Sequence, residues 1–138
     1  MIKVSHETPL CLLQDSKNFN DYDYCLPHLM DECPEYEAYF RQAREDGRYI
    51  IMDNSLHELG EAYNTERLIY WINEILPDEF IVPDVWENCI SSIQNAEIWG
   101  MYVFPKNCTK VAVVQGKSYT DFATGYQRYK WLGYRKND

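Results

Sequence analysis

Apolar residues along this chain fall into two patterns, short continuous runs and longer segments with helical spacing. The runs at residues 48–53 (RYIIMD), 79–84 (EFIVPD) and 110–116 (KVAVVQG) are rich in β-branched and aromatic residues, which favours buried strands. Residues 1–6 (MIKVSH) form a fourth, shorter candidate strand.

Segments with helical spacing separate these runs. Helices are expected over residues 35–46, 66–76, 86–99 and 121–132. Gly47 and Gly133 follow the first and the last of them, where glycine commonly ends a helix. Asn64 or Thr65 is expected to cap the second helix, and Thr120 the last.

Residues 7–34 show neither pattern. They contain three prolines and several Asp and Asn residues, so a long connection with one helical turn near Phe19 is expected. The alternation of strands and helices then predicts an α/β fold with a parallel sheet and right-handed crossovers. Four such units, in a single domain over residues 1–138, would form either a small open sheet or the first half of a TIM-type (β/α)8 barrel.

Composition and charge limit the classes of function. Hydrophobic residues make up 46% of the chain, which is enough for a packed core, but no stretch approaches the ~18 apolar residues of a membrane span. A secretory signal pattern is not visible, so a cytoplasmic protein with no membrane partner is expected. The net charge of −9 disfavours tight nucleic-acid binding. Residues 106–138 nevertheless carry +5, either by chance or because this segment faces an anionic ligand such as DNA or tRNA.

The cysteines and histidines do not suggest a metal site. The five cysteines are odd in number, and no two have the spacing of a zinc or redox motif. His57 and Glu58 begin like a zinc-binding helix, but no second histidine follows at i+4. Reduced thiols, no metal and no cofactor are therefore expected.

Polar residues end the three clearest predicted strands. Asp53, Asp84 and Gln115 stand at these ends, and the carboxyl ends of parallel strands are where α/β folds bind ligands. Two carboxylates and an amide offer acceptors and a donor that match the edge of a purine-like base. Trp86 is the best candidate to stack on that base. Alternatively, each Asp merely caps the next helix, and Gly116 serves only a turn.

Three segments resemble successive strands of the tRNA-guanine transglycosylase superfamily. These segments are YIIMDNSLHELGEA, FIVPDVWEN and VAVVQGKSYTDFATGYQRYKWLG, within about residues 48–133. They are most similar to the phage and bacterial branch that inserts 7-deazaguanine derivatives into DNA. The resemblance implies a (β/α)8 barrel that exchanges guanine for a deazaguanine base through a covalent link between an Asp and C1′ of the sugar.

The resemblance also assigns roles to individual residues. Asp53 matches the Asp that acts as general acid/base or orients the nucleophile. Asp84 matches the Asp that reads the amidine edge of guanine. Gln115 matches the Gln that contacts the base carbonyl, with Gly116 beside it.

Other positions depart from the family pattern. Asn54 and Ser55, also expected to contact substrate, replace a more usual Ser-Gly pair, which changes the expected pocket width. The nucleophilic Asp and the zinc site of the superfamily belong to later strands, beyond this sequence. The chain is therefore expected to be a fragment of a larger barrel, a natural half-barrel, or a half that is completed by a second half-barrel chain or by a homodimer.

Two functions from different classes follow from these observations. The first is base exchange on DNA or tRNA with guanine or 7-deazaguanine, in the host cytoplasm if a bacteriophage encodes the protein. The second is a non-catalytic, degenerate half-barrel that binds a base, nucleic acid or a protein partner.

Overall fold

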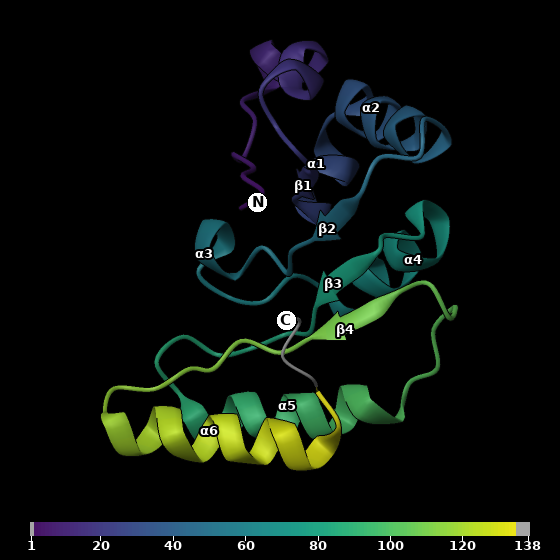
Figure 1. Ribbon diagram of the computed structural model, residues 1–138. Coiled ribbons are helices and arrows are strands. Elements are labelled where there is room, and N and C mark those ends of the chain that lie inside the picture. Colours follow the sequence, from purple (N-terminus) through teal and green to yellow (C-terminus); the bar gives the residue numbers. More distant parts are fainter. Residues whose placement is uncertain (1, 135–138) are drawn as a thin grey trace.

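The computed structural model describes residues 2–134, and its centre is a four-stranded parallel sheet. The strands are β1 (Asp23–Cys25), β2 (Ile50–Met52), β3 (Glu79–Ile81) and β4 (Thr109–Val111). They are arranged in the order β1-β2-β3-β4, so each strand pairs with its neighbour in the sequence (Figure 1). The predicted α/β class with a parallel sheet is confirmed.

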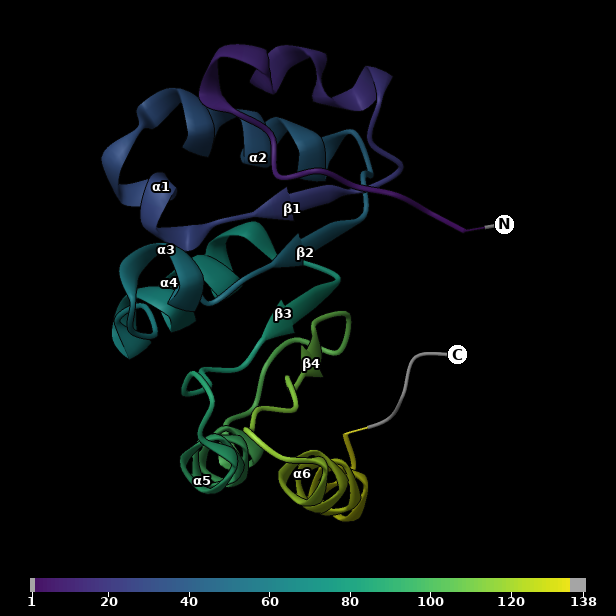
Figure 2. The ribbon, with the colours of Figure 1, turned by 90° about the vertical axis from the view of Figure 1, so that its left-hand side faces the viewer.

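Helices connect the strands. They are α1 (Pro27–Glu32), α2 (Pro34–Glu45), α3 (Leu56–Leu59), α4 (Thr65–Ile75), α5 (Cys89–Met101) and α6 (Tyr119–Leu132), together with a 3-10 helix, η1 (Leu10–Asn18). Helix α2 lies beside β1, whereas α5 and α6 lie side by side beyond β4 (Figure 2). Within residues 2–134, none of these helices has the length and apolar character needed to cross a membrane.

Two rows of side chains cross the sheet on opposite faces. One row consists of Cys25, Met52, Phe80 and Lys110, and the other of Tyr24, Ile51, Glu79 and Thr109. Cys25, Met52 and Phe80 are fully buried and belong to the hydrophobic core. Tyr24 and Ile51 are only half-buried. One face of the sheet therefore packs into the core, while the other face is partly accessible.

The first strand lies where the sequence predicted an irregular connection. Residues 2–6 form no strand, which corrects the expectation for residues 1–6, and Met1 lies outside the described residues. Instead, Val4 exchanges hydrogen bonds with Asp21, through Val4 N to Asp21 Oδ2 at 2.7 Å and Asp21 N to Val4 O at 2.9 Å. The expected connection over residues 7–34 contains η1, β1 and α1.

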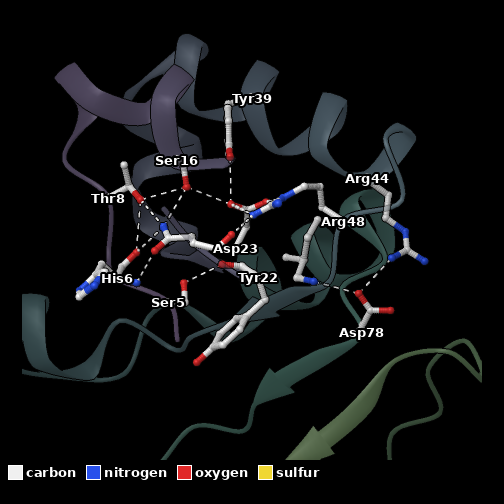
Figure 3. A network of polar contacts seen from close by, with 12 residues as sticks. Ser5, His6, Thr8, Ser16, Tyr22, Asp23, Tyr39, Arg44, Arg48 and Asp78 are labelled. Carbon is white, nitrogen blue, oxygen red and sulfur yellow. Dashed lines mark hydrogen bonds and ion pairs between the residues drawn. The ribbon is translucent and has the colours of Figure 1, made fainter. Parts of the chain in front are cut away.

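Strand β1 was not predicted because it begins with a buried carboxylate. Asp23 is 1% exposed, although Asp is rare in strands. Its charge is compensated by Arg48, whose Nε donates to Asp23 Oδ2 at 2.6 Å, while Tyr39 and Ser16 donate to Oδ1 at 2.9 and 3.1 Å (Figure 3). This bonding also raises the pKa of the Arg48 guanidinium. The network joins η1, α2 and the beginnings of β1 and β2.

Some predicted boundaries shift by several residues. Of the two expected caps of α4, Asn64 is the one that acts, because its Oδ1 accepts from Arg67 N at 3.0 Å. Ser118 rather than Thr120 caps α6, through a capping box with Asp121. Of the predicted strand 110–116, only residues up to Val111 belong to β4, and residues 112–116 follow it without strand structure.

Loss of Arg48 should destabilise the protein strongly. Arg48→Met leaves the Asp23 carboxylate buried without its cation, so we expect the free energy of unfolding in urea to fall by about 3–5 kcal/mol. The matched control is Arg41→Met, because Arg41 forms ion pairs with Glu37 and Glu74 at the surface. That change should cost less than about 1 kcal/mol. Equal losses in the two variants would contradict the assigned role of Arg48.

Candidate functional site

A cavity of ≈ 250 Å³ opens at the carboxyl ends of the strands. Figure 1 shows this end as the one toward which the strand arrowheads point and where α3 follows β2. Five of the residues predicted for the site line the cavity, namely Asp53, Asn54, Asp84, Trp86 and Gln115. Ser55 and Gly116, which were also predicted, are not among the lining residues. The structure therefore brings most of the predicted set together.

Asp84 lies at the centre of a hydrogen-bonded group. Asp84 as a whole is 5% exposed, and each of its carboxylate oxygens accepts a bond from a neutral amide. Asn54 Nδ2 donates to Oδ1 and Gln115 Nε2 donates to Oδ2, both at 2.6 Å. Each carboxylate oxygen keeps further acceptor capacity for a ligand.

Asn54 fixes Asp84 rather than offering groups of its own to a ligand. Its side chain is buried, and Nδ2 donates to Val82 O at 3.0 Å in addition to Asp84. Its Oδ1 accepts from Leu56 N at 3.0 Å. Both amide hydrogens are thus used within the chain, and Asn54 links the end of β2 to the segment that follows β3.

Gln115 has a defined amide orientation. Its Oε1 accepts from Glu87 N at 3.1 Å, and its Nε2 donates to Asp84. One N–H of this amide is left for another acceptor, next to the Asp84 carboxylate. Glu87 itself has a positive φ of 53° and pairs with Lys117 at 3.2 Å.

Asp53 forms a second polar group with Tyr24, which sequence reasoning missed because β1 was not recognised. Tyr24 OH donates to Asp53 Oδ1 at 3.0 Å, and Ser55 N donates to Oδ2 at 2.9 Å. Burial and the nearby charge of Glu58 raise the pKa of Asp53. Burial and the Asp53 charge likewise raise the pKa of the Tyr24 hydroxyl.

Ser55 adopts a backbone conformation that normally favours glycine. Its φ is 56° and its ψ is 23°, in the left-handed region, where a residue with a Cβ is strained by roughly 1–2 kcal/mol. The side chain is fully buried, and its Oγ lies 2.8 Å from His28 Nδ1 in a hydrogen bond. Ser55 contributes to the site through its backbone N–H, which donates to Asp53.

Trp86 and His57 provide aromatic surface at the cavity. Their ring centroids lie 6.0 Å apart and the planes are inclined by 41°. Trp86 is 59% exposed and lines the cavity, so its side chain is accessible to a ligand. This position agrees with the predicted stacking role, which stays a prediction.

The cavity is strongly acidic. Four carboxylates line it, those of Glu7, Asp53, Glu58 and Asp84. Within the described part of the chain, no Lys or Arg is among the lining residues. A ligand rich in N–H groups is favoured there, and a phosphate group is disfavoured.

Gly116 is explained by the turn that precedes α6. A Cβ at this position would lie 2.3 Å from the Cβ of Asp121, closer than atoms can approach. The same Asp121 carboxylate accepts from Lys117 N at 2.9 Å and from Ser118 N at 3.0 Å. A glycine is needed to let this capping carboxylate approach the backbone.

Several basic residues of the C-terminal segment have partners within the chain. Lys110 Nζ donates to the carbonyls of Trp99 and Tyr102 at 2.8 and 2.5 Å, which caps the end of α5, and burial lowers the pKa of Lys110. Arg128 pairs with Glu97. Arg135 and Lys136, which contribute to the predicted basic segment, lie outside the described residues.

None of the five cysteines forms a disulfide bond. All five are free thiols. Among residues 2–134, no three His, Cys, Asp or Glu side chains are grouped so that they could hold a metal ion.

Compared with models of known families, with curated proteins and with solved structures, the chain gives no significant match.

Removing the Asn54 side chain should destabilise the site. Asn54→Ala leaves Val82 O, Leu56 N and one Asp84 oxygen without their partner, so we expect the free energy of unfolding to fall by about 2–4 kcal/mol. The control is Asn73→Ala, which removes one exposed hydrogen bond to Ile69 O and should change stability by less than about 0.5 kcal/mol. Urea unfolding of both variants measures the difference, and similar small losses would contradict the role of Asn54.

Proposed function

We propose that the cavity binds a guanine-like base and that the chain is the base-recognition part of a transglycosylase that exchanges guanine for a 7-deazaguanine in DNA or tRNA. The observation that carries this proposal is the convergence of Asp53, Asp84 and Gln115 on one cavity at the carboxyl ends of successive parallel strands. The same residues carry the resemblance to the transglycosylase superfamily.

The hydrogen-bonding pattern favours a base with a lactam edge. Guanine presents a carbonyl acceptor beside a ring N–H and an amino group on one edge. The Asp84 oxygens supply acceptors for the two donors, and the remaining N–H of Gln115 supplies a donor for the carbonyl. Adenine lacks this carbonyl and its neighbouring ring N–H, so it should bind more weakly.

The surroundings of Asp84 fit a base better than a whole nucleotide. The carboxylates that line the cavity repel a phosphate, so the phosphates of a nucleic acid would have to lie outside it. Trp86 offers an exposed ring at the cavity on which a base could stack. The base would therefore enter the cavity after leaving its stack in the nucleic acid.

We further propose that the fold is the first half of a (β/α)8 barrel. A sheet in which every strand lies next to its sequence neighbour is the arrangement found in such barrels. The edges of β1 and β4 would then join a second set of strands, from a longer polypeptide or from a second half-barrel such as another copy of this chain. The half-buried face that carries Tyr24 and Ile51 would become part of the barrel interior.

In this mechanism, the described residues bind the base and move a proton. Asp84 and Gln115 hold the base by its edge, and Asp53 accepts a proton from the incoming base so that it can attack the sugar. The carboxylate that displaces the old base from C1′ belongs, in the superfamily, to a later strand. This chain would then require the second half of the barrel for exchange, although not for recognition of the base.

One observation favours the alternative of a non-catalytic binding module. Asp84, Asn54 and Gln115 are hydrogen-bonded to one another, so part of their capacity holds the three strand ends together. A module that only binds a base, a nucleic acid or a protein would use these residues in the same way.

Base binding should depend on Asp84. Asp84→Ala removes the acceptors for the ring N–H and amino group, so calorimetric titration with guanine or a 7-deazaguanine should show a loss of about 2–3 kcal/mol in binding free energy. Asp15→Ala, at an exposed carboxylate of η1, is the control and should bind as the wild type does. Equal affinities of the two variants, with both folded by circular dichroism, would refute the assignment of Asp84.

Base exchange separates the transferase from the binding module. The protein in its full assembly, with the chain or segment that completes the barrel, is incubated with labelled guanine and either duplex DNA or tRNA, and the label that enters the nucleic acid is counted. A transferase should incorporate label into one of the two acceptors, and Asp53→Asn should slow incorporation by at least ~100-fold. Binding of guanine without incorporation of label would instead support the non-catalytic module.

A further inference from the structure

We infer that Tyr24 is a positioning residue for Asp53, because its hydroxyl holds the Asp53 carboxylate at the cavity wall as the proton acceptor for a bound base. This inference rests on the proposed function, which gives Asp53 that role. The sequence predicted site residues only at the ends of the runs that form β2, β3 and β4. Tyr24 adds a residue from β1.

The sheet places Tyr24 where it can act in this way. Tyr24 and Ile51 lie level on adjacent strands, and Asp53 follows Ile51 by two positions, so all three point to the same face. The Tyr24 hydroxyl reaches along the sheet to Asp53 Oδ1 at 3.0 Å. Both side chains line the cavity.

The second oxygen of Asp53 is fixed from the backbone. Ser55 N donates to Oδ2 at 2.9 Å, so the carboxylate is held by one donor on each oxygen. Two fixed donors leave the carboxylate little freedom to rotate. The remaining lone pairs are then available to accept a proton from a ligand in the cavity.

The other charged and titratable groups near Asp53 do not replace Tyr24. The groups that interact with Asp53 or share its cavity are Glu58, Glu7, His57, Asp84 and the Cys25 thiol. Burial and Glu58 favour the protonated form of Asp53, and the hydrogen bonds from Tyr24 and Ser55 favour the ionised form. Loss of the Tyr24 hydroxyl should therefore raise the pKa of Asp53 still further.

The test is a titration of the Asp53 carboxyl carbon by ¹³C NMR in the ligand-free protein. Tyr24→Phe keeps the ring and removes the hydroxyl, so the midpoint of the Asp53 titration should move upward by about one to two pH units. Asp53→Asn identifies the resonance. Tyr49→Phe is the matched control, because Tyr49 donates to Glu79 at 2.7 Å outside the cavity, and it should leave the midpoint unchanged.

Guanine binding measured against pH provides the second readout. If Tyr24 positions the proton acceptor, the pH dependence of binding should move upward in Tyr24→Phe together with the NMR midpoint, and not in Tyr49→Phe. An unchanged midpoint in Tyr24→Phe would overturn the inference. A shifted midpoint in a protein whose wild type binds no guanine at any pH would support the Tyr24–Asp53 pair and refute the proposed function instead.

Discussion

The arrangement of the strand ends depends on one buried carboxylate that forms no ion pair within residues 2–134. Asp84 is almost fully buried, and its hydrogen bonds come from the neutral amides of Asn54 and Gln115. A buried charge is costly unless hydrogen bonds replace its hydration. The amides reach Asp84 from the end of β2 and from the segment after β4. These three parts of the chain must therefore keep their present alignment for both Asp84 oxygens to keep their hydrogen bonds.

The carboxylates at the two ends of the sheet have different kinds of partners. At the beginning of β1, Asp23 is paired with Arg48, and the surrounding hydroxyls complete its hydrogen bonds. That charge is neutralised within the protein, which suits a structural role. At the opposite end, Asp53 and Asp84 accept hydrogen bonds, form no ion pair in the described part of the chain, and face a cavity. A ligand with N–H groups can supply what these two carboxylates lack. The two ends therefore differ in charge compensation, because an ion pair neutralises Asp23, whereas Asp53 and Asp84 keep acceptor capacity that faces the cavity.

The sequence predicted the parts of this arrangement that rest on continuous patterns. The apolar runs around Ile50, Phe80 and Val111 indicated three parallel strands, and their polar ends indicated the cavity residues. Strand β1 could not be found in this way, because Asp23 stands at a buried position and only the later Arg48 explains its burial. Tyr24 was missed for the same reason. The hydrogen bond from Asn54 to Asp84 could not be predicted either, because it joins residues of two neighbouring strand ends and a local sequence pattern does not show the distance between them.

Two residues with strained backbone conformations hold side chains of this site in place. Ser55 and Glu87 both have positive φ values, at 56° and 53°, which residues other than glycine rarely adopt. Each uses its own backbone N–H to hold a cavity side chain, Ser55 N on Asp53 and Glu87 N on Gln115. A more relaxed backbone would turn these N–H groups away and leave both side chains free to rotate. The strain is consistent with a site whose hydrogen-bonding groups are oriented before any ligand arrives, since strained residues cluster where geometry is fixed for binding or chemistry.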